Sequence, residues 1–107
     1  MRVLRIFFVV AALAWAEDDA DTRKARERFG LTASRAIALF HSADSIAANL
    51  EARGATLHPD LIAMRQNIER LLDRAEAALD KGDRRAAGRE LDRAEGFLAR
   101  YAKRIGG

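Results

Sequence analysis

The amino-acid sequence predicts an all-α fold, an antiparallel three-helix up-down-up bundle that follows a cleavable signal peptide. Along residues 29–105, apolar positions recur at alternating steps of four and three, which is the spacing of one face of a helix. Gly54 with Pro59, and Gly82 with Asp83, interrupt this pattern. The chain therefore divides into one long helix and a tight helical hairpin, and its 107 residues have room for a single domain.

Residues 1–16 have the composition of a signal peptide. Arg2 and Arg5 form a basic start, and an uncharged apolar run follows until Glu17. This run is shorter than the ~20 apolar residues of a membrane-spanning helix, so we expect no transmembrane segment after processing. An Ala-Trp-Ala sequence predicts cleavage before Glu17, with cleavage after Ala14 as a second possibility. We expect a periplasmic or secreted protein, the alternative being an uncleaved amino-terminal helix.

The charge balance argues against a nucleic-acid partner. The whole chain has a formal net charge of +3. Arg2 and Arg5 leave with the signal peptide and no acidic residue does, so the charge falls by two, to +1. A domain so close to neutrality lacks the basic surface that nucleic-acid binding requires.

Cysteine is absent from the sequence, which excludes disulfides, thiolate metal sites and a cysteine nucleophile. Packing or self-association must therefore stabilise the fold.

The first helix is predicted to be the longest. Residues 17–21 form an acidic segment that we expect to be flexible, and residues 22–107 are expected to form the helical bundle domain. Residues 22–53 contain no proline and one glycine, which favours one continuous helix of about 30 residues. Because the hairpin helices are shorter, its first turns should project beyond the bundle or dock on a second copy. Its expected apolar positions are Phe29, Ala33, Ala36, Phe40, Ala43, Ala47 and Leu50, widened by Leu39 and Ile46 on one side and Ile37 on the other.

The second and third helices form the hairpin. Gly54 suits the left-handed position after a helix, and Pro59 suits the first position of the next one, so residues 54–58 are a connector. The second helix is expected over about residues 59–81. Gly82 and Asp83 then provide a tight turn, with Asp83 as the N-cap of a third helix. The expected apolar faces are Leu61, Met64, Ile68, Leu71, Leu72, Ala75, Ala78 and Leu79 on one helix and Ala87, Leu91, Ala94, Phe97, Leu98, Tyr101 and Ile105 on the other.

The two hairpin helices contain similar segments. Residues 72–79 (LDRAEAAL) recur as residues 91–98 (LDRAEGFL), and so short an offset indicates two similar helices rather than a solenoid array. The glycine-acid turn precedes small and apolar residues at the spacing of a known repeat, namely Ala87, Leu91 and Ala94. Large and small residues of its first helix match at Leu71, Ala75 and Ala78. Residues 68–101 thus resemble a single tetratricopeptide-type helical hairpin. That resemblance implies a scaffold that binds a protein or a peptide.

The sequence contains no convincing catalytic or metal-binding set, and no cofactor is expected. His41, Ser42, Asp44 and Ser45 offer residue types found in hydrolases. A continuous helix has no unpaired backbone N–H groups in its interior to form an oxyanion hole, so catalysis there is disfavoured. The same set supplies at most two metal ligands where zinc needs three or four. His58 in the connector is expected to be an N-cap or a surface residue.

The candidate binding residues are five arginines on the third helix, called here the arginine ridge: Arg85, Arg89, Arg93, Arg100 and Arg104. One interpretation is a solvated face that the first helix or a second subunit neutralises. The other is a docking strip for an anionic partner, because arginine binds phosphate and carboxylate groups bidentately. An acidic row lies on the second helix at Glu69, Asp73, Glu76 and Asp80. A helical wheel places the two rows on opposite-handed flanks, so we do not predict a charge zipper between these rows within the hairpin.

These patterns favour an exported, non-enzymatic helical-bundle protein that acts through protein–protein contact as a scaffold, adaptor or structural module. Its partner is expected to be another protein or a second copy, as in a homodimer. The alternative is an envelope protein that binds anions or lipids through the arginine ridge.

Overall fold

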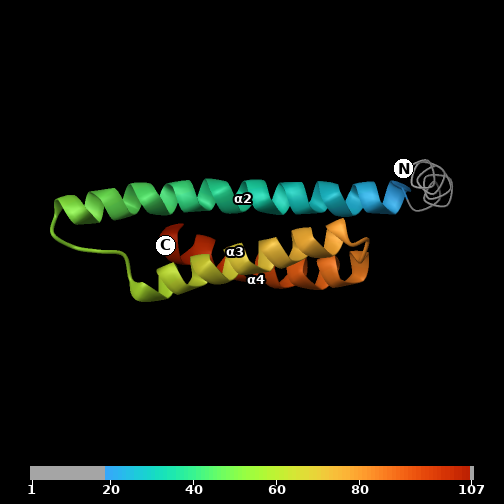
Figure 1. The fold of residues 1–107 in the computed structure, drawn as a ribbon. Coiled ribbons are helices and arrows are strands. Elements are labelled where there is room, and N and C mark those ends of the chain that lie inside the picture. The colour runs from blue at the N-terminus through green and yellow to red at the C-terminus, as the bar shows by residue number, and fades with distance from the viewer. Residues whose placement is uncertain (1–18, 107) are drawn as a thin grey trace, which may run out of the picture.

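The computed structural model describes residues 19–106, and this part of the chain contains three helices and no strand. They are α2 (Asp19–Ala52), α3 (Pro59–Asp80) and α4 (Arg84–Gly106). Figure 1 shows α3 running back along α2, and α4 returning in the direction of α2. The prediction of an all-α fold with three helices is confirmed, and the helix directions follow the up-down-up order.

The first helix begins earlier than the sequence analysis predicted. The proposed signal peptide and residues 17–18 lie outside the described part of the chain. Asp19, Ala20 and Asp21 belong to α2, whereas the predicted helix started at Thr22 and left them in a flexible segment. No proline or glycine interrupts this stretch, and acidic residues near a helix start interact favourably with the positive end of its dipole. These residues therefore extend the helix.

The long helix extends furthest past the hairpin at its carboxyl-terminal end (Figure 1), whereas the sequence analysis expected its first turns to project beyond the bundle or dock on a second copy. Those first turns lie beside the Gly82 turn. Arg84 forms an ion pair with Asp21 at 3.1 Å, and Arg26 forms one with Asp80 at 3.6 Å. The overhang arises because residues 53–58 lead the chain back along α2 before α3 begins.

The helix ends follow the local chemistry of the sequence. Gly54 has a φ of 78°, and the next amide, that of Ala55, donates to the carbonyl of Leu50 at 2.8 Å, which closes the end of α2. His58 accepts a hydrogen bond from the backbone N–H of Asp60 at its Nδ1 atom, so it is an N-cap of α3 as expected.

The hairpin turn is equally local in origin. Gly82 has a φ of 78°, a backbone conformation that favours glycine. Asp83 then caps α4, because its Oδ1 atom accepts from the backbone N–H of Ala86 at 3.0 Å. This tight turn keeps α3 and α4 antiparallel, so that the end of α4 lies beside the first turns of α3.

The core combines large side chains from the hairpin with small ones from α2. Ile68, Leu91, Leu98 and Tyr101 are fully buried. From α2, only Ala36, Phe40 and Ala43 are buried apolar residues within the described part of the chain, and the Phe40 ring meets that of Tyr101 edge to face with centroids 5.7 Å apart. Alanines allow helices to approach closely but bury little apolar area.

One predicted core position is wrong. Ile37 was expected to widen the apolar face of the first helix, but 64% of it is exposed. The opposite flank is as expected, because Leu39 packs against the core. The difference arises because α2 contacts the hairpin along one narrow face, and Ile37 lies outside the arc that contains Ala36, Phe40 and Ala43.

Removing a buried side chain from the hairpin should destabilise the fold strongly. Leu98→Ala should lower the free energy of unfolding by about 2–5 kcal/mol, because it leaves a cavity in a fully buried site. Ile62→Ala is the control, since Ile62 is 51% exposed and should cost less than about 1 kcal/mol. Urea unfolding followed by circular dichroism measures both, and similar losses would contradict this packing.

Candidate functional site

The five arginines of the ridge divide into two groups in the structure. Arg85, Arg89 and Arg93 occupy the first half of α4 and are exposed. Within residues 19–106, no carboxylate forms an ion pair with any of these three, so α2 does not neutralise this half of the ridge. Arg100 and Arg104 lie near the end of α4, where they line a groove with residues of both hairpin helices.

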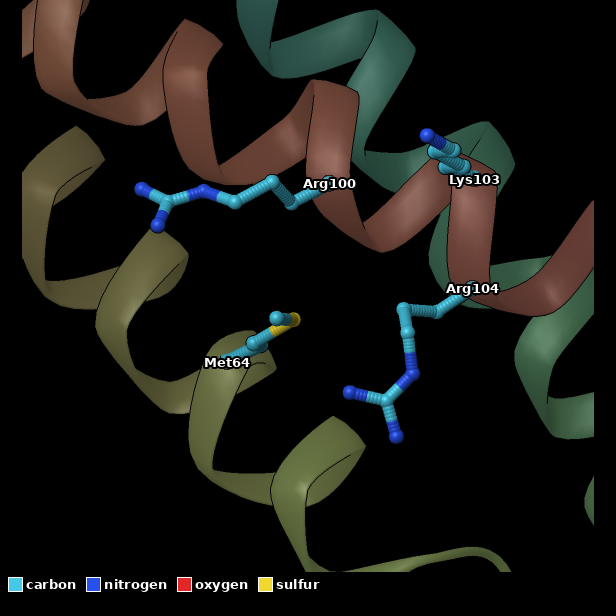
Figure 2. Close-up of a pocket in the computed structure, with 4 residues that line it drawn as sticks. All are labelled: Met64, Arg100, Lys103 and Arg104. Carbon is cyan, nitrogen blue, oxygen red and sulfur yellow. The ribbon is translucent and has the colours of Figure 1, made fainter.

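The groove lies between α3 and α4 and has a volume of about 680 Å³ (Figure 2). Met64 extends from α3 toward α4, and Arg100, Lys103 and Arg104 come from the last two turns of α4. The tight hairpin brings these residues together, because it sets the last turns of α4 beside the first turns of α3. An apolar floor therefore meets a cationic rim.

Three contacts orient the arginines of the groove. The guanidinium carbon of Arg100 lies 4.6 Å from the centre of the Phe97 ring, a cation–π arrangement, and its Nε atom donates to the carbonyl of Gly96 at 3.4 Å. Arg104 lies 3.9 Å from the carboxylate of Asp60 on α3. Both partners of that ion pair are largely exposed, so the pair adds little stability and is easily exchanged.

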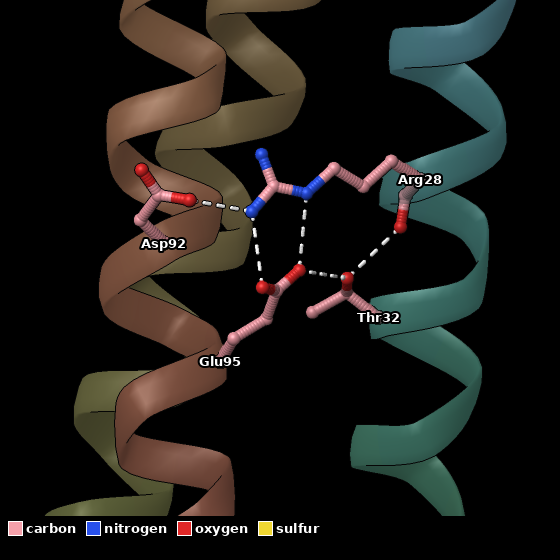
Figure 3. Close-up of polar contacts among 4 residues, drawn as sticks. All are labelled: Arg28, Thr32, Asp92 and Glu95. Carbon is pink, nitrogen blue, oxygen red and sulfur yellow. Dashed lines mark hydrogen bonds and ion pairs between the residues drawn. The ribbon is translucent and has the colours of Figure 1, made fainter.

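A second polar cluster connects α2 with α4 and was not found by the sequence analysis (Figure 3). Arg28 on α2 donates to both carboxylate oxygens of Glu95, at 3.1 and 3.0 Å, and to Asp92 at 2.6 Å. Thr32, one turn further along α2, donates to Glu95 at 3.2 Å and to the carbonyl of Arg28 at 2.9 Å. Bidentate pairing of this kind fixes the orientation of α2 against α4.

The charges of the cluster shift each other's proton affinity. Hydrogen bonds from Arg28 hold the pKa of Glu95 below its ordinary value, because they stabilise the ionised carboxylate. The two carboxylates raise the pKa of Arg28 in return. Asp92 and Glu95 lie on one face of α4, and Arg28 and Thr32 on one face of α2. The spacing of these residues along each helix can be read from the sequence. The rotation of α2 and α4 that turns these two faces toward each other cannot.

Another arginine, Arg65 of α3, connects α3 with α2. Arg65 donates to Asp44 of α2 at 2.7 Å and to Glu69 of its own helix at 3.2 Å. Its guanidinium carbon also lies 4.6 Å from the centre of the Phe40 ring. The predicted acidic row thus divides, since Glu69 pairs within α3 and Asp80 pairs with Arg26 of α2.

The residues around His41 do not converge on a reactive centre. His41 and Ser45 are exposed, Ser42 donates to the carbonyl of Ala38 at 3.2 Å, and Asp44 is paired with Arg65. Across residues 19–106, no group of three or more His, Asp or Glu side chains is arranged to hold a metal ion. The groove and the exposed half of the ridge are therefore the features that offer binding chemistry.

Removing the charge of Arg28 should weaken the attachment of α2 to α4. We expect Arg28→Gln to lower the free energy of unfolding by about 1 kcal/mol at pH 7, a modest value because Glu95 is 40% exposed. Arg35→Gln, an exposed arginine on the same helix, is the control and should change it by less than about 0.5 kcal/mol.

The effect of Arg28→Gln should also depend on pH. The pKa of Glu95 is lower in the folded state than its ordinary value of 4.5, so its ionised carboxylate stabilises the fold at pH values above 4.5. That stabilisation is lost as the pH falls through the folded-state value. The difference between the parent and Arg28→Gln should therefore narrow below about pH 4.5 in urea unfolding. A difference that stays constant at acidic pH would contradict the role given to Glu95.

No known protein family, curated protein or solved structure matches the chain. The tetratricopeptide resemblance of residues 68–101 stays a prediction.

Proposed function

We propose that this protein is an exported, non-enzymatic helical-bundle module that acts through protein–protein contact, with a second copy of itself as the partner. The observation that supports the proposal is a pair of large apolar side chains on the outer side of α2. Leu31 is 74% exposed and Ile37 is 64% exposed, although both lie within a well-formed helix. Exposed apolar surface that is gathered in one region marks protein contact sites, and these two side chains lie within two helical turns of each other.

The surroundings of these two residues favour another helix as the partner. An exposed arc of α2, called here the outer stripe, contains no Asp, Glu, Lys or Arg; its members are Gly30, Leu31, Ser34, Ile37, Ala38, His41, Ser45 and Ala48. The arc covers about 27 Å of helix at 1.5 Å per residue. Small residues let a second helix approach closely, and the lack of charge removes repulsion between identical copies.

The part of the stripe over residues 30–38 is self-complementary about Ser34, whereas His41 and Ser45 would lie at the level of Glu27 and Arg23 of the second copy. If two copies of α2 cross antiparallel with the two-fold axis at Ser34, residues whose numbers sum to 68 face each other. Leu31 then lies at the same level as Ile37 of the second copy but on the opposite flank of the contact, and Gly30 lies at the level of Ala38. Four large side chains thus surround a centre of small residues. The contact is one helix wide, so we expect a weak, reversible dimer rather than a permanent one.

Self-association should depend on Ile37. The protein is purified after export, and its intact mass identifies its first residue. In sedimentation equilibrium, its average mass should rise toward that of a dimer at about 100 μM. Ile37→Glu should keep it monomeric, because a carboxylate would be buried in the contact between the two copies. Ile62→Glu, on α3 and outside the stripe, should dimerise like the parent. A parent that stays monomeric at about 1 mM would refute the proposal.

A second candidate function rests on the exposed half of the ridge. Arg85, Arg89 and Arg93 lie along one side of α4, and no carboxylate of the described residues pairs with them. Three unpaired guanidinium groups along about 12 Å of helix suit an anionic surface. None of the described helices has an apolar stretch long enough to cross a membrane. In this second candidate function, the ridge binds an anionic envelope surface.

The ridge can be tested with lipid vesicles. Changing Arg85, Arg89 and Arg93 together to Gln should reduce binding to phosphatidylglycerol vesicles about tenfold at low salt, and the difference should shrink as salt screens the charges. The matched control changes Arg35, Arg70 and Arg74 to Gln, which removes the same charge from exposed positions outside the ridge. Equal losses in both variants, in a cosedimentation assay, would show that only net charge matters.

A further inference from the structure

The groove between α3 and α4 combines two kinds of surface that a single ligand would use together. Its volume of about 680 Å³ is in the range of small-molecule sites, which span about 300–1,000 Å³. Three of its four lining residues are cationic and the fourth is Met64 (Figure 2).

The floor of the groove is apolar. Met64 is partly buried and packs against the core that includes Leu61, Ile68 and Tyr101. Its unbranched thioether side chain adapts to irregular ligand shapes. The methylene stems of Arg100 and Arg104 add apolar surface on either side, since arginine side chains keep only their ends polar. An extended hydrocarbon chain matches such a floor.

The rim of the groove has an excess of positive charge. Within the described part of the chain, Asp60 is the one carboxylate in ion-pair contact with the rim, at 3.9 Å from Arg104. Arg100 is oriented by Phe97 rather than by an acid, and its guanidinium group extends from α4 toward α3. The guanidinium groups of Arg100 and Arg104 lie on opposite sides of Met64, so an anionic head group finds an arginine at either end of the groove (Figure 2).

We propose that this groove binds a single-chain fatty acid, with the carboxylate held at the cationic rim by Arg100 or Arg104 and the hydrocarbon chain over Met64. Arginine pairs bidentately with carboxylates, and Lys103 adds charge without a fixed geometry. A small inorganic anion would use the rim but leave the floor uncovered. The inference goes beyond the second candidate function, because the groove uses Arg100 and Arg104 and not Arg85, Arg89 and Arg93. It does not depend on self-association through the outer stripe.

The NMR signal of the Met64 methyl group reports ligand binding in the groove. The chain has two methionines, Met1 and Met64, so methyl-¹³C-methionine labelling gives a groove signal with at most one other. Titration with dodecanoate below its micelle concentration should shift the Met64 methyl signal saturably. Changing Arg100 and Arg104 together to Gln should weaken the affinity at least about tenfold, because it removes the arginine at each end of the groove that could pair with the carboxylate. Asp60→Asn should tighten binding, because it removes the carboxylate that competes for Arg104.

Matched controls separate this site from general electrostatics. The variant with Arg85, Arg89 and Arg93 changed to Gln loses more charge but leaves the groove intact, so its dodecanoate affinity should stay within about twofold of the parent. A double change of Arg100 and Arg104 to Lys should restore part of the affinity, and thermal unfolding checks that every variant is folded.

Three results would overturn the proposal. The first is a Met64 signal that does not move with dodecanoate. The second is an equal loss of affinity in the groove and ridge variants, which would indicate attraction by net charge. The third is inorganic phosphate binding as tightly as dodecanoate, which would leave the hydrocarbon chain without a role. Loss of vesicle binding by the ridge variant with intact dodecanoate binding would support both sites separately.

Discussion

The attachment of α2 to the hairpin is the constraint on which the surfaces of this protein depend. Apart from Phe40, the buried apolar residues that α2 contributes within the described part of the chain are alanines, and alanine burial supplies little hydrophobic free energy. Ion pairs between α2 and the hairpin supplement this packing, and those of Arg28 and Arg65 include hydrogen bonds. Arg28 pairs with Asp92 and Glu95 on α4, and Arg65 pairs with Asp44 on α2. Together with the Phe40–Tyr101 contact, they fix both the position of α2 and its rotation about its own axis.

That rotation decides which side chains remain on the surface. With Ala36 and Ala43 turned inward, Leu31 and Ile37 face away from the hairpin, and the arc around them contains small, uncharged residues. A rotation of α2 by one residue, about 100°, would change which of these groups reach the hairpin. The outer stripe is therefore a consequence of the same contacts that hold the three helices together.

The hairpin sets the other surface independently of α2. The tight turn at Gly82 and Asp83 fixes the register of α3 and α4, and this register brings Met64 beside Arg100 and Arg104. The outer stripe and the groove thus lie on different elements. Because the two proposals use separate residues, self-association and ligand binding can take place on one molecule without competing.

The sequence by itself determined where most helices begin and end and which hairpin residues are buried. Gly54, Gly82, Asp83 and His58 act through conformation and hydrogen bonds within a few residues, and the spacing of Leu91, Leu98 and Tyr101 follows from helix geometry alone. The exposure of Ile37, the pairing of Arg28 with Glu95 and the groove beside Met64 were decided only by the tertiary structure. Each depends on how one helix is rotated and shifted against another. Neither quantity is encoded in the local pattern, because many rotations of an alanine-rich helix bury similar apolar area.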